Sequence, residues 1–178
     1  MDGGGTVKNK LENRLAYLYR GERNGLIIFI VISYLFNQVY PNLQLYSLFS
    51  FWMSFLLLEF LLLQGTFYWY TKLKRLRIEN TSVTPIRTIR QLQRCKKMNM
   101  LLIMLSIFAF VFDIVRLYPS LPIGGLSIAG FIYIFAVLEY INYFYVQLSY
   151  DNISDVKYLL KSKKLKKACI SKDFKRIS

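Results

Sequence analysis

Apolar residues gather along the chain in four long runs, and basic residues lie almost entirely between and outside those runs. We place the runs at Leu26 to Tyr40, Leu45 to Tyr70, Met98 to Tyr118 and Leu121 to Tyr150. A helix needs about 20 predominantly apolar residues to cross a hydrocarbon core of about 30 Å. The first run is the shortest and reaches that length only with residues that precede Gly25. The pattern therefore predicts four transmembrane helices.

Short turns that contain proline, Pro41-Asn42 and Pro119-Ser120, divide the runs into two pairs. This arrangement predicts an all-α integral membrane protein with two tandem hairpins and amphipathic basic helices on the cytoplasmic side. The expected segments are an amphipathic N-terminal segment (1–25), hairpin 1 (26–71), a basic loop (72–97), hairpin 2 (98–150) and a basic tail (151–178). The spacing from proline to glutamate is similar in both hairpins, which is typical of either an internal repeat or two unrelated apolar hairpins.

The basic residues predict the orientation of these helices. The chain has 24 Lys and Arg residues against 10 Asp and Glu, and its formal net charge is +14. All of the basic residues except Arg116 fall before the first run, in the 72–97 loop or in the tail. Because Lys and Arg concentrate in cytoplasmic loops, both termini and the loop are expected in the cytoplasm, with the protein in a plasma or inner membrane.

Basic residues also recur at helical spacing beside the runs. Thr84-Pro85 is a candidate N-cap and first-turn pair for a helix over Ile86 to Met98, and the tail repeats the basic amphipathic pattern. Such helices bind anionic headgroups, so we expect a lipid surface, together with a protein partner or a second copy of the chain. Nucleic acid is disfavoured because the aromatic residues lie in the apolar runs and no nucleic-acid module is visible. The candidate binding residues are Arg87, Arg90, Arg94, Lys97, Lys161, Lys163, Lys164, Lys166 and Lys167.

Two carboxylates lie within the apolar runs, Glu59 in the second and Glu139 in the fourth. A rise of about 1.5 Å per residue places both at a similar depth. They predict either a proton or cation site or neutral acids that hydrogen-bond neighbouring helices together. Asp113 and Arg116 are three residues apart on one helix, so a local pair is expected. Further polar candidates within the runs are Asn37, Gln64 and Asn142.

Small residues gather in the outer half of the fourth run. Gly125 and Ala129 have the four-residue spacing that lets helix backbones approach closely, and Gly130 follows them. This stripe predicts a tight helix contact, either within one chain or between two copies.

Catalytic and metal-binding motifs are scarce. The chain has no histidine and only two cysteines, which is insufficient for a zinc site, and no cofactor is expected. Asp151 and Asp155 form a weak candidate for magnesium, with capping of a helix N-terminus as the favoured alternative. These observations favour a non-catalytic subunit or scaffold of a membrane assembly. The alternatives are a proton- or cation-coupled channel or transporter and, less favoured, a lipid-modifying enzyme.

Overall fold

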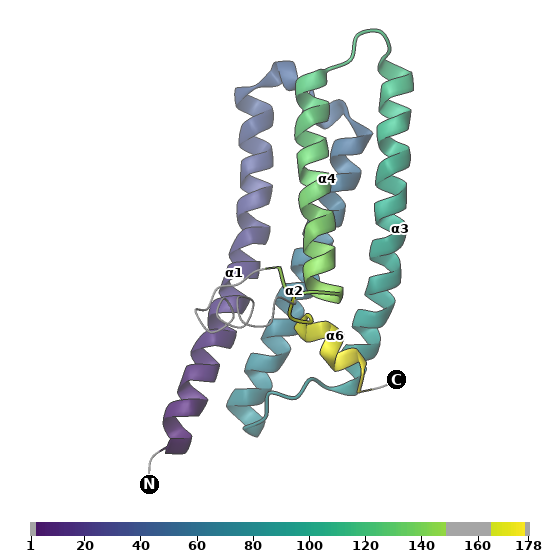
Figure 1. Cartoon of the computed structure of the whole chain (residues 1–178). Coiled ribbons are helices and arrows are strands. Elements are labelled where there is room, and N and C mark those ends of the chain that lie inside the picture. The colour runs from purple at the N-terminus through teal and green to yellow at the C-terminus, as the bar shows by residue number, and fades with distance from the viewer. Residues whose placement is uncertain (1–2, 149–164, 177–178) are drawn as a thin grey trace.

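The structure is a computed structural model of the chain, and it describes residues 3–148 and 165–176, with side chains from residue 7. The described residues are helical apart from short connections, so the expected all-α class is confirmed. The elements in chain order (Figure 1) are α1 (Gly3–Val39), the 3-10 helices η1 (Pro41–Leu43) and η2 (Leu45–Ser47), α2 (Phe49–Glu79), α3 (Ile86–Leu117), α4 (Ile123–Phe144) and α6 (Cys169–Phe174).

Three helices, α2, α3 and α4, are each long and apolar enough to cross a membrane. Helix α1 meets the same criterion only together with η1 and η2, and the chain bends by 99° between them. The bend lies where Pro41 begins η1, and proline cannot continue the hydrogen bonding of the preceding helix. The structure therefore supports a helical membrane protein with three, or up to four, membrane-crossing helices.

Helices α2 and α3 both extend into the segment predicted to be a basic loop, 72–97. Only residues 80–85 between them are not helical. Asn80 ends α2 with a left-handed φ of 55°, a conformation that asparagine adopts more readily than most residues. The segment is mostly helix because its basic residues alternate with apolar ones that pack, such as Leu73 and Leu76.

Helix α2 is the centre of the bundle, and α1, α3 and α4 all pack against it. Its side chains Leu57, Leu58 and Leu61 are fully buried and pack with Ala136 and Tyr140 of α4. The consecutive helices α3 and α4 contact each other much less than either contacts α2. Figure 1 shows them apart, with α2 behind α4. The two helices of the second predicted hairpin are thus joined mainly through α2.

Both described chain ends and the α2–α3 connection lie at one end of the bundle (Figure 1). We call it the basic end, because α2 and α3 carry most of their Lys and Arg residues there. At this end α1 packs along α2 through Leu15 and Ala16. Glu12 and Arg77 join the same two helices with an ion pair of 2.7 Å. The amphipathic N-terminal segment therefore packs its apolar side on α2.

The short helix α6 docks on the basic end through Asp173. Its carboxylate accepts hydrogen bonds from the hydroxyls of Tyr68 at 2.8 Å and Thr84 at 2.5 Å, and it pairs with Lys72 at 3.3 Å. Thr84 therefore binds α6 and does not cap α3, which corrects the expected Thr84 cap. Pro85 precedes the first residue of α3 with no side-chain cap.

The small residues of α4 pack within one chain at the opposite end. Gly125 and Ala129 are buried against the η1 and η2 segment. A Cβ atom on Gly125 would lie 2.1 Å from the carbonyl oxygen of Leu43, so only glycine fits there. Gly130 does not share this contact, since no described heavy atom lies within 4 Å of its Cβ position.

Candidate functional site

Asp113, one of the predicted intramembrane polar residues, caps a neighbouring helix. Its side chain is fully buried and accepts the backbone N–H groups of Phe49 at 3.2 Å and Ser50 at 2.7 Å. These are the first two residues of α2, whose N–H groups have no partner within the helix. A carboxylate is also favourable beside the positive end of a helix dipole. Asp113 therefore joins α3 to the start of α2.

Arg116 does not pair with Asp113 among the described residues. Its guanidinium lies over the ring of Phe49, 5.6 Å from the ring centroid, in a cation–π contact. The local pair expected from their three-residue spacing is thus replaced by two contacts from α3 to the same turn of α2.

Gln64 forms a reciprocal pair of hydrogen bonds with Asn99 of α3. Each amide nitrogen donates to the other amide's oxygen at 3.0 Å, and both side chains are buried. The pair satisfies polar groups that would be costly alone in an apolar interior. Asn37 lies half-buried on α1 and takes no part in this contact. Sequence reasoning missed Asn99, which directly follows the start of an apolar run.

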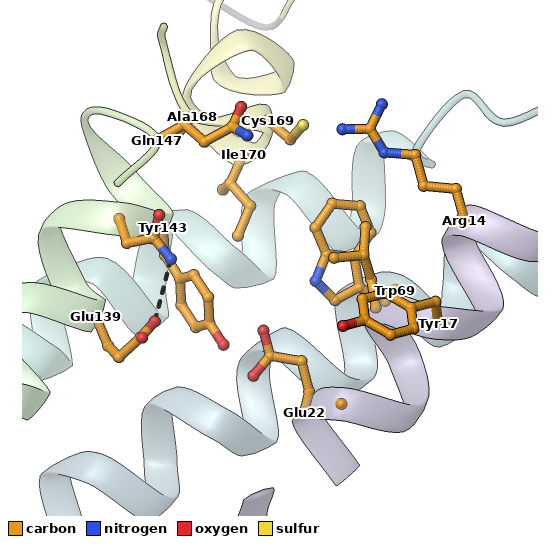
Figure 2. Close-up of a pocket in the computed structure, with 13 residues that line it drawn as sticks. Arg14, Tyr17, Glu22, Trp69, Glu139, Tyr143, Gln147, Ala168, Cys169 and Ile170 are labelled. Atoms are coloured by element: carbon orange, nitrogen blue, oxygen red, sulfur yellow. Dashed lines mark hydrogen bonds between the residues drawn. The ribbon is translucent and has the colours of Figure 1, made fainter. Parts of the chain in front are cut away.

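Glu59 and Glu139 have different surroundings. Both carboxyl oxygens of Glu59 are buried without a hydrogen-bond partner among the described residues. Glu139 instead accepts a hydrogen bond from the Asn142 amide at 3.2 Å and lines a pocket at the basic end. Glu59 does not line that pocket. The second carboxylate beside Glu139 is Glu22 of α1 (Figure 2).

The pocket around Glu139 has a volume of about 280 Å³ and lies between α1, α2, α4 and α6. Tyr143 lies between the two carboxylates, and its hydroxyl points toward Glu22 (Figure 2). Trp69 and Tyr17 form an aromatic wall beside Glu22. This pocket could not be predicted from the sequence, because Glu22 lies outside the apolar runs and aromatic residues recur throughout them.

Gly65 of α2 makes the close approach of these groups possible. A Cβ atom there would lie 2.3 Å from the Tyr143 hydroxyl oxygen and 2.9 Å from the Glu22 carboxyl carbon. Neither separation is tolerated by real Cβ atoms, so a larger residue would displace Tyr143 or Glu22. Glycine at this position therefore brings α1 and α4 side chains together over α2.

A second cavity at the basic end is a groove of about 740 Å³ between α3, α4 and α6. It exists because α3 and α4 contact each other little. Its charged side is α3, which contributes Arg90, Arg94, Lys96 and Lys97. Four cations along one groove create a positive potential that attracts anions.

The other side of this groove, which we call the basic groove, is aromatic. Tyr140, Tyr145 and Phe174 line it. Phe174 is held in place by stacking on Phe144, with ring centroids 6.0 Å apart. Lys96 lies over the Tyr145 ring at 4.2 Å, which joins the charged and aromatic sides.

Electrostatics near this region reflect crowded positive charge. The neighbouring Lys175 lowers the pKa of Lys167 through a hydrogen bond and charge repulsion. The shift of Lys167 is what crowding of two cations produces.

The other predicted binding residues are distributed more widely. Arg87 is exposed on α3 outside the basic groove. The backbone oxygen of Lys166 accepts the Gln147 N–H at 2.7 Å, and Lys167 forms an isolated bridge with Val146. The remaining candidates lie outside the described residues: Lys161, Lys163, Lys164, Asp151 and Asp155.

Comparison of the chain with protein-family models, with curated proteins and with solved structures found no match. The geometry of these two cavities is therefore the basis for any functional assignment.

Proposed function

We propose that this protein is a non-catalytic subunit or scaffold of a membrane assembly that holds the headgroup of an anionic lipid in the basic groove. In this proposal four helices cross a plasma or inner membrane as two tandem hairpins, and the basic end is cytoplasmic. The observation that carries the proposal is the groove itself, with four cations on one side and aromatic rings on the other. Basic pockets between membrane helices are typical sites for acidic lipid headgroups.

The residues of the groove suit a phosphodiester with acyl chains. Arg90 and Arg94 are one helical turn apart on α3, and guanidinium groups bind phosphate oxygens in a bidentate manner. Each Lys or Arg near an anionic surface contributes roughly 1 kcal/mol. Tyr145 and Phe174 provide apolar surface for the glycerol and upper acyl region, as aromatic residues do at membrane interfaces.

The scaffold part of the proposal is supported by the polar residues inside the bundle. Asp113 accepts hydrogen bonds from the N-terminus of α2, and Gln64 forms hydrogen bonds with Asn99. Such contacts join helices, which is the role expected of polar residues in a scaffold. A protein partner or a second copy of the chain belongs to the same proposal, and chemical cross-linking in native membranes tests it.

Lipid binding is tested by thermal unfolding of the full-length protein in nanodiscs of phosphatidylcholine with and without phosphatidylglycerol. We expect phosphatidylglycerol to raise the unfolding midpoint of the wild type. It should not raise the unfolding midpoint of the double variant Arg90→Gln/Arg94→Gln. The control Lys10→Gln/Arg20→Gln removes the same charge from exposed positions of α1 and should retain the effect. Inorganic phosphate should not replace the lipid.

Two results would contradict the assignment. One is equal stabilisation of the wild type by neutral and acidic lipid. The other is an equal loss of the effect in both double variants, because this would indicate attraction by net charge alone without a specific groove.

A second candidate function, cation- or proton-coupled transport, is favoured by Glu59. Its two carboxyl oxygens are buried and unpartnered among the described residues, and intramembrane acids commonly mark ion pathways. Proton or cation flux in proteoliposomes tests it. Flux in the wild type that is lost in Glu59→Gln would favour transport over the scaffold.

A further inference from the structure

The basic groove carries more positive charge than one phosphodiester would balance. Its cations are Arg90, Arg94, Lys96 and Lys97, and no carboxylate lines it among the residues that the structure describes. None of the four forms an ion pair with a described Asp or Glu side chain. Because a phosphodiester has a single negative charge, a headgroup with only that charge would leave most of the positive charge in the groove uncompensated.

The two acids that adjoin lining residues in the chain do not neutralise the groove. Asp173 directly precedes Phe174, but its carboxylate pairs with Lys72 at 3.3 Å and accepts two hydroxyl groups. Glu139 directly precedes Tyr140, but it lines the pocket between α1, α2, α4 and α6. The charges around Asp173 are thus balanced within the chain, whereas those of the basic groove are not.

The cations form two pairs along α3. Arg90 and Arg94 are one helical turn apart, and Lys96 and Lys97 follow them. At a rise of about 1.5 Å per residue, the centres of the two pairs are roughly 7 Å apart along the helix axis. Lys96 reaches the Tyr145 ring, 4.2 Å from its centroid, at the aromatic side of the groove. The groove therefore offers two positions for phosphate, each beside two cations.

The membrane-facing end of the groove is apolar. Met100 lines it one helical turn beyond Lys96, and Met104 lies on the same face of α3 a further turn along. Both methionines are 47% exposed, so an acyl chain can lie against them. This surface leads from the cations toward the hydrocarbon, and a soluble diphosphate would leave it uncovered.

We propose that the basic groove selects phospholipids whose headgroup contains two phosphate groups. The inference rests on the proposed function, because it specifies which anionic lipid the groove holds. One phosphate lies beside the arginine pair, the second lies beside the lysine pair, and an acyl chain follows Met100 toward the hydrocarbon. Cardiolipin, with two phosphates bridged by glycerol, and phosphatidylinositol 4-phosphate both have this chemistry.

Native mass spectrometry of the full-length protein in mild detergent measures the dissociation constant of each added lipid. We expect cardiolipin, phosphatidylinositol 4-phosphate or both to bind at least about tenfold more tightly than phosphatidylglycerol, which has one phosphate, because contacts with two further cations strengthen binding. The lipid with the larger gain identifies the linker that fits between the two phosphates. Inorganic pyrophosphate at the same concentration should not displace the lipid, since it has no chain for the apolar end.

Substitutions of the lysine pair separate this inference from the proposed function. Lys96→Gln/Lys97→Gln should lose the preference for two phosphates and still bind phosphatidylglycerol, because the arginine pair remains. Lys97→Gln, at an exposed position, should lose part of the preference and decides the result if the double variant does not fold. The matched control Lys10→Gln/Arg20→Gln removes the same charge from exposed positions of α1 and should keep the full preference.

Three outcomes would overturn the inference and leave the proposed function intact. The first is binding of phosphatidylglycerol as tight as that of both lipids with two phosphates. The second is an equal preference in the wild type and Lys96→Gln/Lys97→Gln. The third is an equal loss of preference in Lys96→Gln/Lys97→Gln and in the α1 control. Displacement of the lipid by pyrophosphate would indicate a soluble ligand, and absence of binding by every acidic lipid would overturn the proposed function as well.

Discussion

Replacement of Asp113 by alanine should destabilise the bundle more than any single exposed change. The substitution removes two hydrogen bonds to a carboxylate, at 3.2 Å from Phe49 N–H and 2.7 Å from Ser50 N–H. Hydrogen bonds to charged groups contribute roughly 1.5 to 3 kcal/mol each. The two N–H groups would also remain without a partner at the start of α2, since its N-cap residue Leu48 provides no side-chain acceptor. We therefore expect a loss of about 3 to 5 kcal/mol in the free energy of unfolding.

The assay is reversible unfolding in mixed micelles, combined with hydrogen exchange of the Phe49 and Ser50 amides. Both amides should exchange faster in Asp113→Ala than in the wild type. Asp113→Asn keeps one acceptor oxygen and should lose about half as much stability. Arg116→Gln, on the same turn of α3, removes a cation–π contact of roughly 0.5 to 1 kcal/mol and is the matched control. A loss below about 0.5 kcal/mol in Asp113→Ala, within the range of neutral surface changes, would refute the capping role.

Three further predictions concern single contacts. Gln64→Leu should cost about 1 to 3 kcal/mol of unfolding free energy because it leaves Asn99 unpaired, whereas the double variant with Asn99→Leu should recover part of the loss in a double-mutant cycle. Gly125→Ala should lower the thermal unfolding midpoint, because its methyl group would clash with the Leu43 carbonyl 2.1 Å away, and an unchanged midpoint would contradict this packing. Asp173→Ala removes the acceptor of two hydroxyls and the partner of a lysine, so proteolysis at the C-terminus should accelerate while α1 stays protected.

The helices could be predicted from the sequence because an apolar run of membrane-crossing length satisfies all its backbone hydrogen bonds within itself only as a helix. The start of the helix at Ile86 was also predicted and is confirmed, because α3 begins there. The end of α2 could not be predicted, since Leu73 and Leu76 continue an apolar stripe into a strongly basic segment. The first apolar run is also too short to cross a membrane without the residues that precede Gly25. In the structure α1 likewise meets the length and hydropathy criterion only together with η1 and η2. Composition therefore predicted the all-α membrane class, but it did not predict where α1 and α2 end.

The partners of the polar residues were the main failure of sequence reasoning. Local spacing favoured Arg116 as the partner of Asp113, but the helix N-terminus beside it offers two N–H donors that a side chain on the same helix cannot match. Equal depth favoured Glu59 as the neighbour of Glu139, but depth does not determine which way a helix face points. Glu22, which lies in a charged segment, became the neighbour because α1 continues unbroken past the apolar run.

Helix α6 contributes a wall to both cavities, so their shapes are physically linked. Phe174, at the end of α6, lines the basic groove, while Cys169 and Ile170, at its start, line the pocket around Glu139. Six residues are too few to form a stable helix alone, so the position of α6 depends on its tertiary contacts, chiefly those of Asp173. Displacement of Asp173 from Tyr68 would therefore change the walls of both cavities together.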